Sequence, residues 1–403
     1  MKNDLNCHPV TSLQNSSTRA TPRLHSTLLL ALLSALTILA NPSALAQTFS
    51  VLYAFKGTDG FGPRAGLVRD GAGNLYGTTE LGGGGDGEVF KLDKTNSLTQ
   101  LHVFSSGTGG LLPFSQLARD SNGNLYGTTE LGGSSNAGTV FKLDKTNHET
   151  ILYNFTGGTD GGQPVAGLVR DAKGNLYGTT SSGGAASGLG VIFKVTPSKH
   201  ETVLHTFTGK KDGAQPMARL VMDSTGNLYG TAAGGGTAGS GVVFKLDTAN
   251  HFTVLHSFSS GKDGAIPMAD LIIDTAGNLY GTTFAGGANS LGIIFKLSPT
   301  GKETRLYTFV AAKGGAPAAG LVQDTAGNLY GTTEFGGSAN GGVVFKLNTG
   351  NNVSVLHDLC SEQNCADGEF PVADLILDSK GSLYGTASAG GTGSSGIVFK
   401  VAP

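Results

Sequence analysis

Short runs of apolar residues alternate with polar, glycine-rich segments along the chain from about residue 48 to its end. In one representative stretch the runs occupy residues 166–171, 175–180, 190–195 and 201–207, and they are rich in Val, Leu, Tyr, Phe and Thr. Each run is bounded by Gly, Asp, Asn or Pro, which is typical of β-strands separated by turns. No segment after residue 46 has a 3.6-residue apolar period long enough for a helix. The pattern predicts four strands in this stretch and an all-β protein.

This four-strand pattern is repeated seven times along the chain. Its marker is the string Gly-Asn-Leu-Tyr-Gly-Thr, which reads Gly-Ser-Leu-Tyr-Gly-Thr in the last copy and recurs 50 to 54 residues apart. The tyrosines of the copies are Tyr76, Tyr126, Tyr177, Tyr229, Tyr280, Tyr330 and Tyr384. Four strands in about 50 residues make one β-propeller blade, whereas a β-helix has much shorter repeats. The sequence predicts one seven-bladed β-propeller, with four antiparallel strands per blade, over residues 47–403 and no second domain.

The two ends of the repeat region complement each other. Residues 48–55 match the fourth strand of the other copies, while the seventh copy ends after its third strand. A strand shared between the chain ends would join the first and last blades by backbone hydrogen bonds and leave no open sheet edge. We therefore expect residues 51–55 to pair with residues 397–401 and to complete the seventh blade.

The first 46 residues differ from the repeats and contain no Gly. Arg19 and Arg23 precede an apolar stretch at residues 28–40, and the string Ala44-Leu45-Ala46 follows it. A basic flank, a short apolar core and an Ala-x-Ala site are the features of a secretory signal peptide. The core is shorter than the roughly 20 residues that span a bilayer. We expect residues 1–46 to be a signal peptide cleaved after Ala46, and the mature chain to be periplasmic or secreted without a membrane span.

Composition narrows the possible partners. The 27 Lys+Arg are balanced by 29 Asp+Glu, which argues against binding to nucleic acid or to anionic membranes. With 38% hydrophobic residues the chain has enough apolar surface to fold. The 65 Gly show no three-residue period, so they exclude collagen and indicate many tight turns.

Only Cys360 and Cys365 follow the expected signal peptide, since the third cysteine is Cys7. An exported protein meets an oxidising compartment, so these two residues predict a disulfide within the loop that enters the last blade. A metal site would need further Cys or His nearby, and His357 alone does not supply it. We therefore expect no metal site.

The repeated motifs resemble a known family. Gly-Asn-Leu-Tyr-Gly-Thr-Thr is followed by Gly-Gly, Val-Phe-Lys-Leu, a Val-Leu-x-x-Phe strand and Asp-Gly-x-x-Pro, and this order is similar to the GloVer tandem repeat of exported bacterial proteins. The resemblance covers nearly all of residues 49–401 and implies a propeller-like repeat fold and export. Members are described as "choice-of-anchor" because varied sorting segments follow their repeats, whereas this sequence ends at Pro403 without one. The resemblance implies no particular activity.

Residues that recur in every copy are expected to build the blades, because a functional site occurs once. A Leu column, a Phe column and the Tyr column should pack blade against blade, and the Asp-x-x-Gly-Asn strings should form tight turns. A calcium loop at these strings would need more oxygen ligands than one Asp and one Asn provide. The Lys of Val-Phe-Lys-Leu is expected to pair with the turn Asp near one rim. The Leu column is Leu67, Leu117, Leu168, Leu220, Leu271, Leu321 and Leu375, and the Phe column is Phe90, Phe141, Phe193, Phe244, Phe295, Phe345 and Phe399.

Catalytic motifs are missing from the sequence. It contains no Gly-x-Ser-x-Gly elbow, phosphate-binding loop or His-Glu-x-x-His, and its Gly-rich segments follow strands but never open a helix, as a dinucleotide fingerprint would, so no cofactor is predicted. The strand histidines occupy one repeat position in different copies, which should keep them too far apart to share a metal. These are His102, His205, His256 and His357.

Positions that break the repeat are the candidate site. In an up-and-down blade the two long, Gly-rich connections emerge on one face, where they are either binding loops or simple spacers. The residues just before the Leu column include Gln116, Arg219, Asp270 and Asp374, with Gly66, Gly167 and Gly320 leaving room for a ligand. We expect the four polar residues around the mouth of the channel, and Glu80, Glu130 and Glu334 as a second ring. The mixture suits a hydroxyl-rich or cationic ligand, and ordinary solvated edge residues remain the alternative.

Two classes of function fit these observations. The first is an exported, non-enzymatic binding propeller, monomeric, whose ligand is a glycan, a peptide or an envelope protein. The alternative is an extracellular lyase or hydrolase in which carboxylates such as Asp270 and Asp374 act as acid and base. The sequence does not separate the two.

Overall fold

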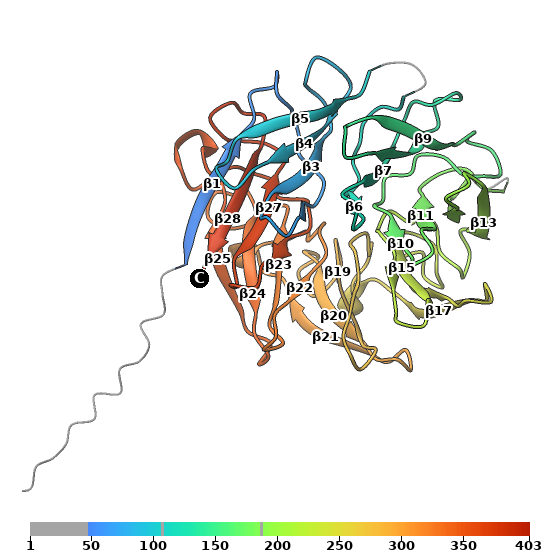
Figure 1. Cartoon of the computed structure of the whole chain (residues 1–403). Helices are drawn as coiled ribbons and strands as arrows, with labels where there is room; N and C mark the ends of the chain where they lie inside the picture. Colours follow the sequence, from blue (N-terminus) through green and yellow to red (C-terminus); the bar gives the residue numbers. More distant parts are fainter. Residues whose placement is uncertain (1–46, 106–108, 186–187) are drawn as a thin grey trace, which may run out of the picture. The chain divides into compact units, whose positions relative to one another are not determined.

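The computed structural model describes residues 47–105, 109–185 and 188–403, which form seven four-stranded antiparallel sheets (Figure 1). The predicted seven-bladed β-propeller is confirmed. The helical elements within these residues are three short 3₁₀ turns, η1 (Gly261–Asp263), η2 (Ala311–Lys313) and η3 (Gln363–Cys365). None of the helices in the described part of the chain has the length and apolar character to cross a bilayer. The expected signal peptide, residues 1–46, lies outside the described residues.

Each blade consists of four strands in order from the channel outward. Blades 1 to 3 comprise β2 (Val68–Arg69), β3 (Leu75–Thr79), β4 (Glu88–Leu92) and β5 (Leu98–Val103); β6 (Ala118–Arg119), β7 (Leu125–Thr129), β8 (Thr139–Leu143) and β9 (Glu149–Asn154); and β10 (Val169–Arg170), β11 (Leu176–Thr180), β12 (Val191–Val195) and β13 (Glu201–Thr206). Blades 4 and 5 comprise β14 (Val221–Met222), β15 (Leu228–Ala232), β16 (Val242–Leu246) and β17 (Phe252–Ser257); and β18 (Ile272–Ile273), β19 (Leu279–Thr283), β20 (Ile293–Leu297) and β21 (Glu303–Thr308). Blades 6 and 7 comprise β22 (Val322–Gln323), β23 (Leu329–Thr333), β24 (Val343–Leu347) and β25 (Val353–Asp358); and β26 (Ile376–Leu377), β27 (Leu383–Ala387), β28 (Ile397–Ala402) and β1 (Thr48–Ala54).

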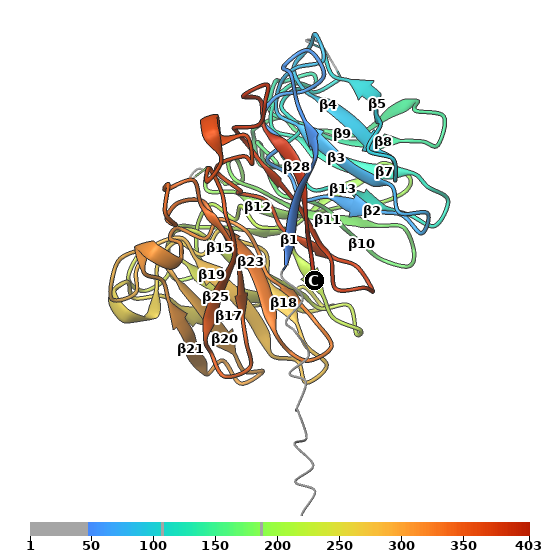
Figure 2. The same cartoon turned by 90° about the vertical axis from the view of Figure 1, so that its left-hand side faces the viewer.

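The seventh blade contains both ends of the repeat region. Strand β1 pairs antiparallel with β28, from Thr48 opposite Ala402 to Ala54 opposite Ile397 (Figure 2). The predicted pairing of residues 51–55 with residues 397–401 is confirmed. Stacking of Phe49 on His357 of blade 6, with ring centroids 3.6 Å apart, adds a contact between neighbouring blades.

The innermost strands are shorter than the sequence suggests. Residues 166–171 were expected as one strand, but only Val169–Arg170 pair within the sheet. The segment before this pair bonds to the preceding blade instead, since Thr128 Oγ1 donates to the carbonyl of Ala166 at 3.0 Å. The same bond recurs around the ring and joins blade 7 to blade 1 through Thr386 and the carbonyl of Ala65. Backbone groups that look available for a sheet are thus used between blades.

The core lies between blades, as the repeated Leu and Phe columns predict. The seven leucines are at most 3% exposed and the seven phenylalanines are fully buried. The second Gly of each marker string makes room for the Phe ring, because a Cβ on Gly178 would lie 2.7 Å from Phe193 Cζ. This close approach explains why the marker has Gly at that position.

The Asp turns have the hydrogen bonds that the sequence predicts. In blade 4, one oxygen of Asp223 accepts the backbone N–H groups of Thr225 and Asn227, each at 2.9 Å. The other oxygen accepts from the Asn227 side chain at 2.8 Å and from the Tyr229 hydroxyl at 3.1 Å. Burial alone would raise the pKa of Asp223, but these hydrogen bonds lower it to about 2.

The expected pairing of the repeated lysines with these aspartates is wrong. Within the described residues, none of the seven lysines forms an ion pair with a turn Asp, whose oxygens already accept several hydrogen bonds. Five of the lysines instead place their ammonium group 5.3 to 5.9 Å from the centroid of a Tyr ring in the same blade, a cation–π contact. They are Lys194, Lys245, Lys296, Lys346 and Lys400.

Candidate functional site

The four predicted polar residues line the same two cavities in the channel. Gln116, Arg219, Asp270 and Asp374 all line a cavity of about 740 Å³ whose rim includes turn residues such as Asp378 and Ser379. The same four residues line a second cavity, of about 120 Å³, together with residues that follow the long loops, such as Phe114. We call these four residues the waist, because they line both cavities.

This arrangement differs from the expected channel mouth in one respect. The waist lies between the two ends of the channel, and the larger cavity opens toward the Asp turns rather than toward the long loops. The long loops pair with one another in every blade, as in the bridges between Gly162 and Ser182 and between Ala214 and Gly234. This pairing favours an ordered rim over simple spacers.

Hydrogen bonds tie the waist residues to neighbouring blades. Arg219 of blade 4 donates from Nε to Asp270 Oδ2 at 2.8 Å and from its backbone N–H to Asp270 Oδ1 at 2.7 Å. Asp374 Oδ1 accepts the backbone N–H of Gly320 at 2.6 Å, and Gln116 Nε2 donates to the carbonyl of Leu67 at 3.1 Å. The Arg219 side chain remains 38% exposed and that of Asp270 15%, so the ion pair still faces the cavity.

Asp270 and Asp374 are two acidic side chains that interact electrostatically at the waist, and Arg219 also acts on Asp374. Burial raises the pKa of Asp374 well above its usual value, and the negative charge of Asp270 adds to the effect, while Arg219 opposes it. Asp270 is the ion-pair partner of Arg219. The waist thus holds two acidic side chains next to one guanidinium.

The space above the waist glycines is occupied, so the expected room for a ligand is absent there. A Cβ on Gly66 would lie 2.7 Å from Gln116 Nε2, and one on Gly320 would lie 2.9 Å from Asp270 Cβ. A Cβ on Gly167 would lie 3.0 Å from Arg219 Cδ. The glycines leave space for larger side chains of neighbouring blades to pack against the backbone at these positions.

The three glutamates of the expected second ring lie outside the lining of both cavities. Glu80 accepts from Arg64 Nε at 2.7 Å. Burial raises the pKa of Glu130, with a further contribution from the charge of Glu80. Burial also raises the pKa of Glu334, and the charge of Arg64 opposes that shift. Their part in binding stays a prediction.

One buried acid was missed in the sequence. Glu88 begins the third strand of blade 1, where the other blades have Thr, Val or Ile, and it is fully buried. Burial raises its pKa to about 7, although Gln100 donates to Glu88 Oε2 at 2.6 Å. A comparison of all seven third strands would have revealed this exception.

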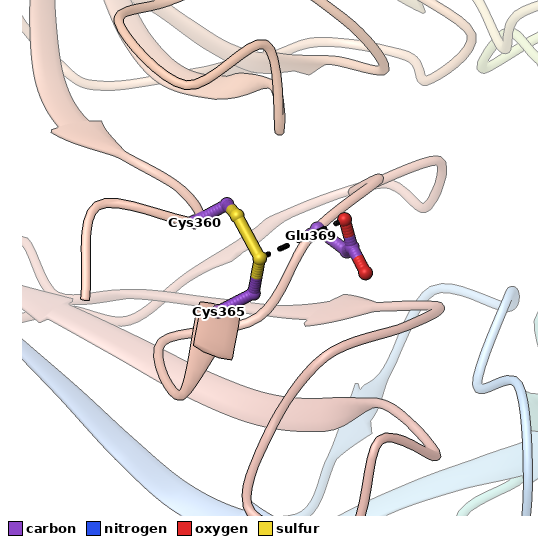
Figure 3. Close-up of side chains that lie close together, drawn as sticks. All are labelled: Cys360, Cys365 and Glu369. Carbon is purple, nitrogen blue, oxygen red and sulfur yellow. Dashed lines mark hydrogen bonds between the residues drawn. A yellow bond between two sulfur atoms is a disulfide. The ribbon is translucent and has the colours of Figure 1, made fainter. Parts of the chain in front are cut away.

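The two cysteines are paired in the structure, in the loop before β26 (Figure 3). Glu369 lies beside them, with Oε2 3.8 Å from Cys365 Sγ. Among the described residues these three form the one group of potential metal ligands gathered closely enough to share an ion. Pairing of the sulfur atoms removes the thiolates that such a site would use. The loop is held by the fully buried Asp367, which accepts from Ser361 and His357.

Fold and waist together define a β-propeller built from seven near-identical blades around one non-repeating polar ring. The chain belongs to the Gloeobacter/Verrucomicrobia repeat family, whose model matches residues 40–185, 150–276 and 223–403. This confirms the family resemblance seen in the motifs. A comparison with curated proteins gives no match.

Solved structures share the fold at low sequence identity. Virginiamycin B lyase from Staphylococcus aureus is 12% identical with a TM-score of 0.59, over 89% of this chain and 99% of the lyase. The extracellular domain of a protein named as a one-component system of B. thetaiotaomicron is 11% identical with a TM-score of 0.58, over 88% of this chain and 40% of that one. A protein named as a 6-phosphogluconolactonase from Bacteroides uniformis is 16% identical with a TM-score of 0.52, over 78% of this chain and 88% of that one. These similarities establish the fold alone.

Proposed function

We propose that this protein is an exported, monomeric binding propeller without catalytic activity, which holds a polar group of a small ligand at the waist. The cavity of about 740 Å³ carries this proposal. Its walls include apolar first-strand residues such as Val68, Ile272 and Ile376, and its floor is the waist. Its lining also includes the polar residues Arg69, Arg119, Asp378 and Ser379. A cavity in which apolar walls adjoin convergent polar groups is typical of a ligand pocket.

The waist offers both donors and acceptors. Arg219 is partly exposed, the pKa of Asp374 is raised, and Gln116 Oε1 is buried without a hydrogen-bond partner. An unpartnered buried acceptor gains free energy from a ligand hydroxyl or N–H. These donors and acceptors suit a hydroxyl-rich ligand. In this proposal Glu80, Glu130 and Glu334 form a second ring of contacts beyond the waist.

Thermal shifts test the proposal directly. Residues 47–403 are screened against sugars, amino sugars and sugar acids, because a ligand that binds only the folded state raises the melting temperature. Gln116→Ala and Arg219→Ala should abolish any shift found, whereas Lys145→Ala, in an exposed turn of blade 2, should leave it unchanged. A shift that survives both waist variants would refute the waist as the site.

Acid–base catalysis is the second candidate, favoured by the neighbouring acidic groups Asp270 and Asp374 and by the raised pKa of Asp374. A carboxyl group kept protonated next to a charged one can donate a proton to a leaving group while the other removes one. The fold is also that of a lyase and of a protein named as a lactonase. Turnover of any ligand from the screen, lost in Asp374→Asn with binding retained, would establish an enzyme. Binding without turnover supports a binding protein.

Export and the disulfide belong to the same proposal. The leader at residues 1–46 and the extracellular location of one protein with this fold support export. Expression of the full sequence in a bacterium should yield an exported chain that begins at Gln47. Mass spectrometry of that material should find Cys360 bonded to Cys365, and two free thiols would contradict this.

A further inference from the structure

The end of the innermost strand carries a different charge in two parts of the ring. In blades 1 to 3 this position holds an arginine, namely Arg69, Arg119 or Arg170. In blades 4 to 7 it holds an uncharged residue, namely Met222, Ile273, Gln323 or Leu377. The turn Asp and the strand Lys occur in every blade. The arginines therefore add one positive charge to each of three neighbouring blades.

Two of these arginines line the cavity of about 740 Å³ on the side of the Asp turns. Arg69 and Arg119 each lie over the Tyr ring of the preceding blade, with 5.7 Å from Cζ to the ring centroid. Neither forms an ion pair in the part of the chain that the structure describes. Arg170 has the same contact with Tyr126 but is not part of this lining. We call Arg69 and Arg119 the rim arginines.

The rim of the cavity has an excess of positive charge. Among the described residues, Asp378 is the one carboxylate that lines the cavity at this level, and the other turn aspartates lie outside the lining. Asp378 already accepts hydrogen bonds from the backbone N–H groups of Lys380 and Ser382, each at 2.9 Å, and from the Tyr384 hydroxyl at 3.1 Å. Two guanidinium groups against one carboxylate favour the binding of a further negative charge at the rim.

The waist has the opposite excess. Asp270 and Asp374 face one guanidinium, that of Arg219, whose Nε already donates to Asp270. Burial raises the pKa of Asp374, and the charge of Asp270 adds to the effect. Gln116 Oε1 is buried and has no hydrogen-bond partner among the described residues. An ammonium group of a ligand would supply three donors and the missing positive charge, which suits both Asp374 and Gln116.

Apolar side chains lie between these two levels. Ile272, Val322 and Ile376 each come one residue before the rim position of their blade, and all three line the cavity. The step from the waist position to the rim position is three residues, as from Gln116 to Arg119, and spans at most about 10 Å of extended chain. A ligand that matches the cavity has an apolar middle part and opposite charges within this distance.

We propose that the cavity binds a short linear peptide, with its N-terminal ammonium group at the waist and its C-terminal carboxylate at the rim arginines. An extended peptide of about three residues has the length of this path. Its apolar side chains pack on Ile272, Val322 and Ile376. A neutral sugar would engage the waist but leave the charge of the rim unmatched. The inference rests on the waist site proposed above and names the class of ligand.

Calorimetric titration of residues 47–403 with trialanine and two derivatives tests both ends of the peptide. N-acetylation removes the ammonium group, and C-terminal amidation removes the carboxylate. Trialanine should bind, and each derivative should bind at least about tenfold more weakly, because each loses charge-assisted hydrogen bonds.

Variants assign each end of the peptide to one level of the cavity. Arg69→Gln with Arg119→Gln should weaken the binding of trialanine by at least about tenfold but leave that of trialanine amide unchanged, since the amide has no carboxylate to lose. Asp374→Asn should likewise weaken the binding of trialanine and leave that of acetyl-trialanine unchanged. Arg170→Gln is the matched control, because it removes the same contact with a Tyr ring outside the cavity. Melting curves establish that each variant remains folded.

The outcomes separate this proposal from the waist site on which it rests. No binding of trialanine, equal binding of its derivatives, or an equal loss in Arg170→Gln would overturn the peptide proposal. If a sugar binds at the waist and trialanine does not, the peptide proposal fails and the waist site stands. Trialanine binding that survives both Gln116→Ala and Arg219→Ala would refute the waist and the peptide proposal together.

Discussion

The Asp turns and the waist are two rings of the same propeller. The Asp that defines the turns is present in every blade, whereas the residues of the waist are not the same in every blade. In the turns, the Asp and the Tyr are the same in all seven blades, and each Tyr hydroxyl donates to its Asp. At the waist, the seven equivalent positions hold Gly, Gln, Arg and Asp. A contact needed by every blade is repeated, whereas the waist residues differ from blade to blade.

The carboxyl groups of the two rings also differ in their surroundings and in the direction of their pKa shifts. Each turn carboxylate accepts several hydrogen bonds, which lower its pKa and stabilise the fold. At the waist, two acidic groups are brought together and the pKa of Asp374 rises. A structural ring minimises the free energy of its charges, whereas the waist retains an unfavourable pair of the type common in functional sites.

Removal of β1 should have the largest effect on stability, because it leaves the seventh blade with three strands. Without residues 48–54, β28 loses its partner and the contact between Phe49 and His357 is lost. We expect a loss of more than about 5 kcal/mol, comparable to the total stability of many domains, and aggregation through the open edge. Denaturant unfolding and light scattering measure both. A monomeric truncated protein with an unchanged melting temperature would contradict the closure.

Substitution within the turn ring comes next. Asp223→Ala removes the acceptor for Thr225, Asn227 and Tyr229 and should lower the free energy of unfolding by about 2 kcal/mol. The matched control is Asp247→Ala, in an outer turn of the same blade, which accepts from Ala249 and His251 but from no Tyr, and should cost less. Equal losses would show that the Tyr bond adds nothing.

Glu88 is the one acidic residue in a column that otherwise holds Thr, Val or Ile, and its effect on stability depends on pH. Its folded pKa of about 7 exceeds the ordinary value of 4.5, so the folded state binds the proton more tightly. Stability from this group is therefore greatest below pH 4.5 and declines as the pH rises to 7. Glu88→Gln should be more stable than the unmodified protein by up to ~2 kcal/mol at pH 8, with the difference shrinking toward pH 5. A constant difference across this range would disprove the titration, and exposed Glu362→Gln is the control.

Of these variants, a conservative substitution at the waist should have the smallest effect on the free energy of unfolding. Asp374→Asn imitates the protonated acid, so we expect a change of less than ~0.5 kcal/mol at pH 5. The raised pKa of Asp374 means that ionisation opposes folding, so the variant should gain relative stability as the pH rises. Urea unfolding at three pH values tests this. A large loss at pH 5 would mean that the waist is a structural ring like the turns.

Local patterns predicted those parts of the fold that depend on neighbours in sequence. Alternating apolar runs and the recurring Gly-Asn-Leu-Tyr-Gly-Thr string predicted strands, blades and the role of β1, because hydrogen-bond register and burial follow a period visible in the chain. The polar residues before Leu117, Leu220, Leu271 and Leu375 were recognisable as exceptions to the same period. The irregular column placed four candidates at one level of the channel.

Distances across the ring were decided only by the tertiary structure. The proximity of Asp270 to Asp374 and of Gln116 to Gly66 depends on residues from different blades, about 50 to 100 residues apart in sequence. Repeated lysines such as Lys245 contact a tyrosine ring rather than a turn aspartate, because the backbone N–H groups of the turn already donate hydrogen bonds to the carboxylate oxygens. Burial likewise raises the pKa of Glu88, an effect that comes from the surrounding blade and not from its neighbours in sequence.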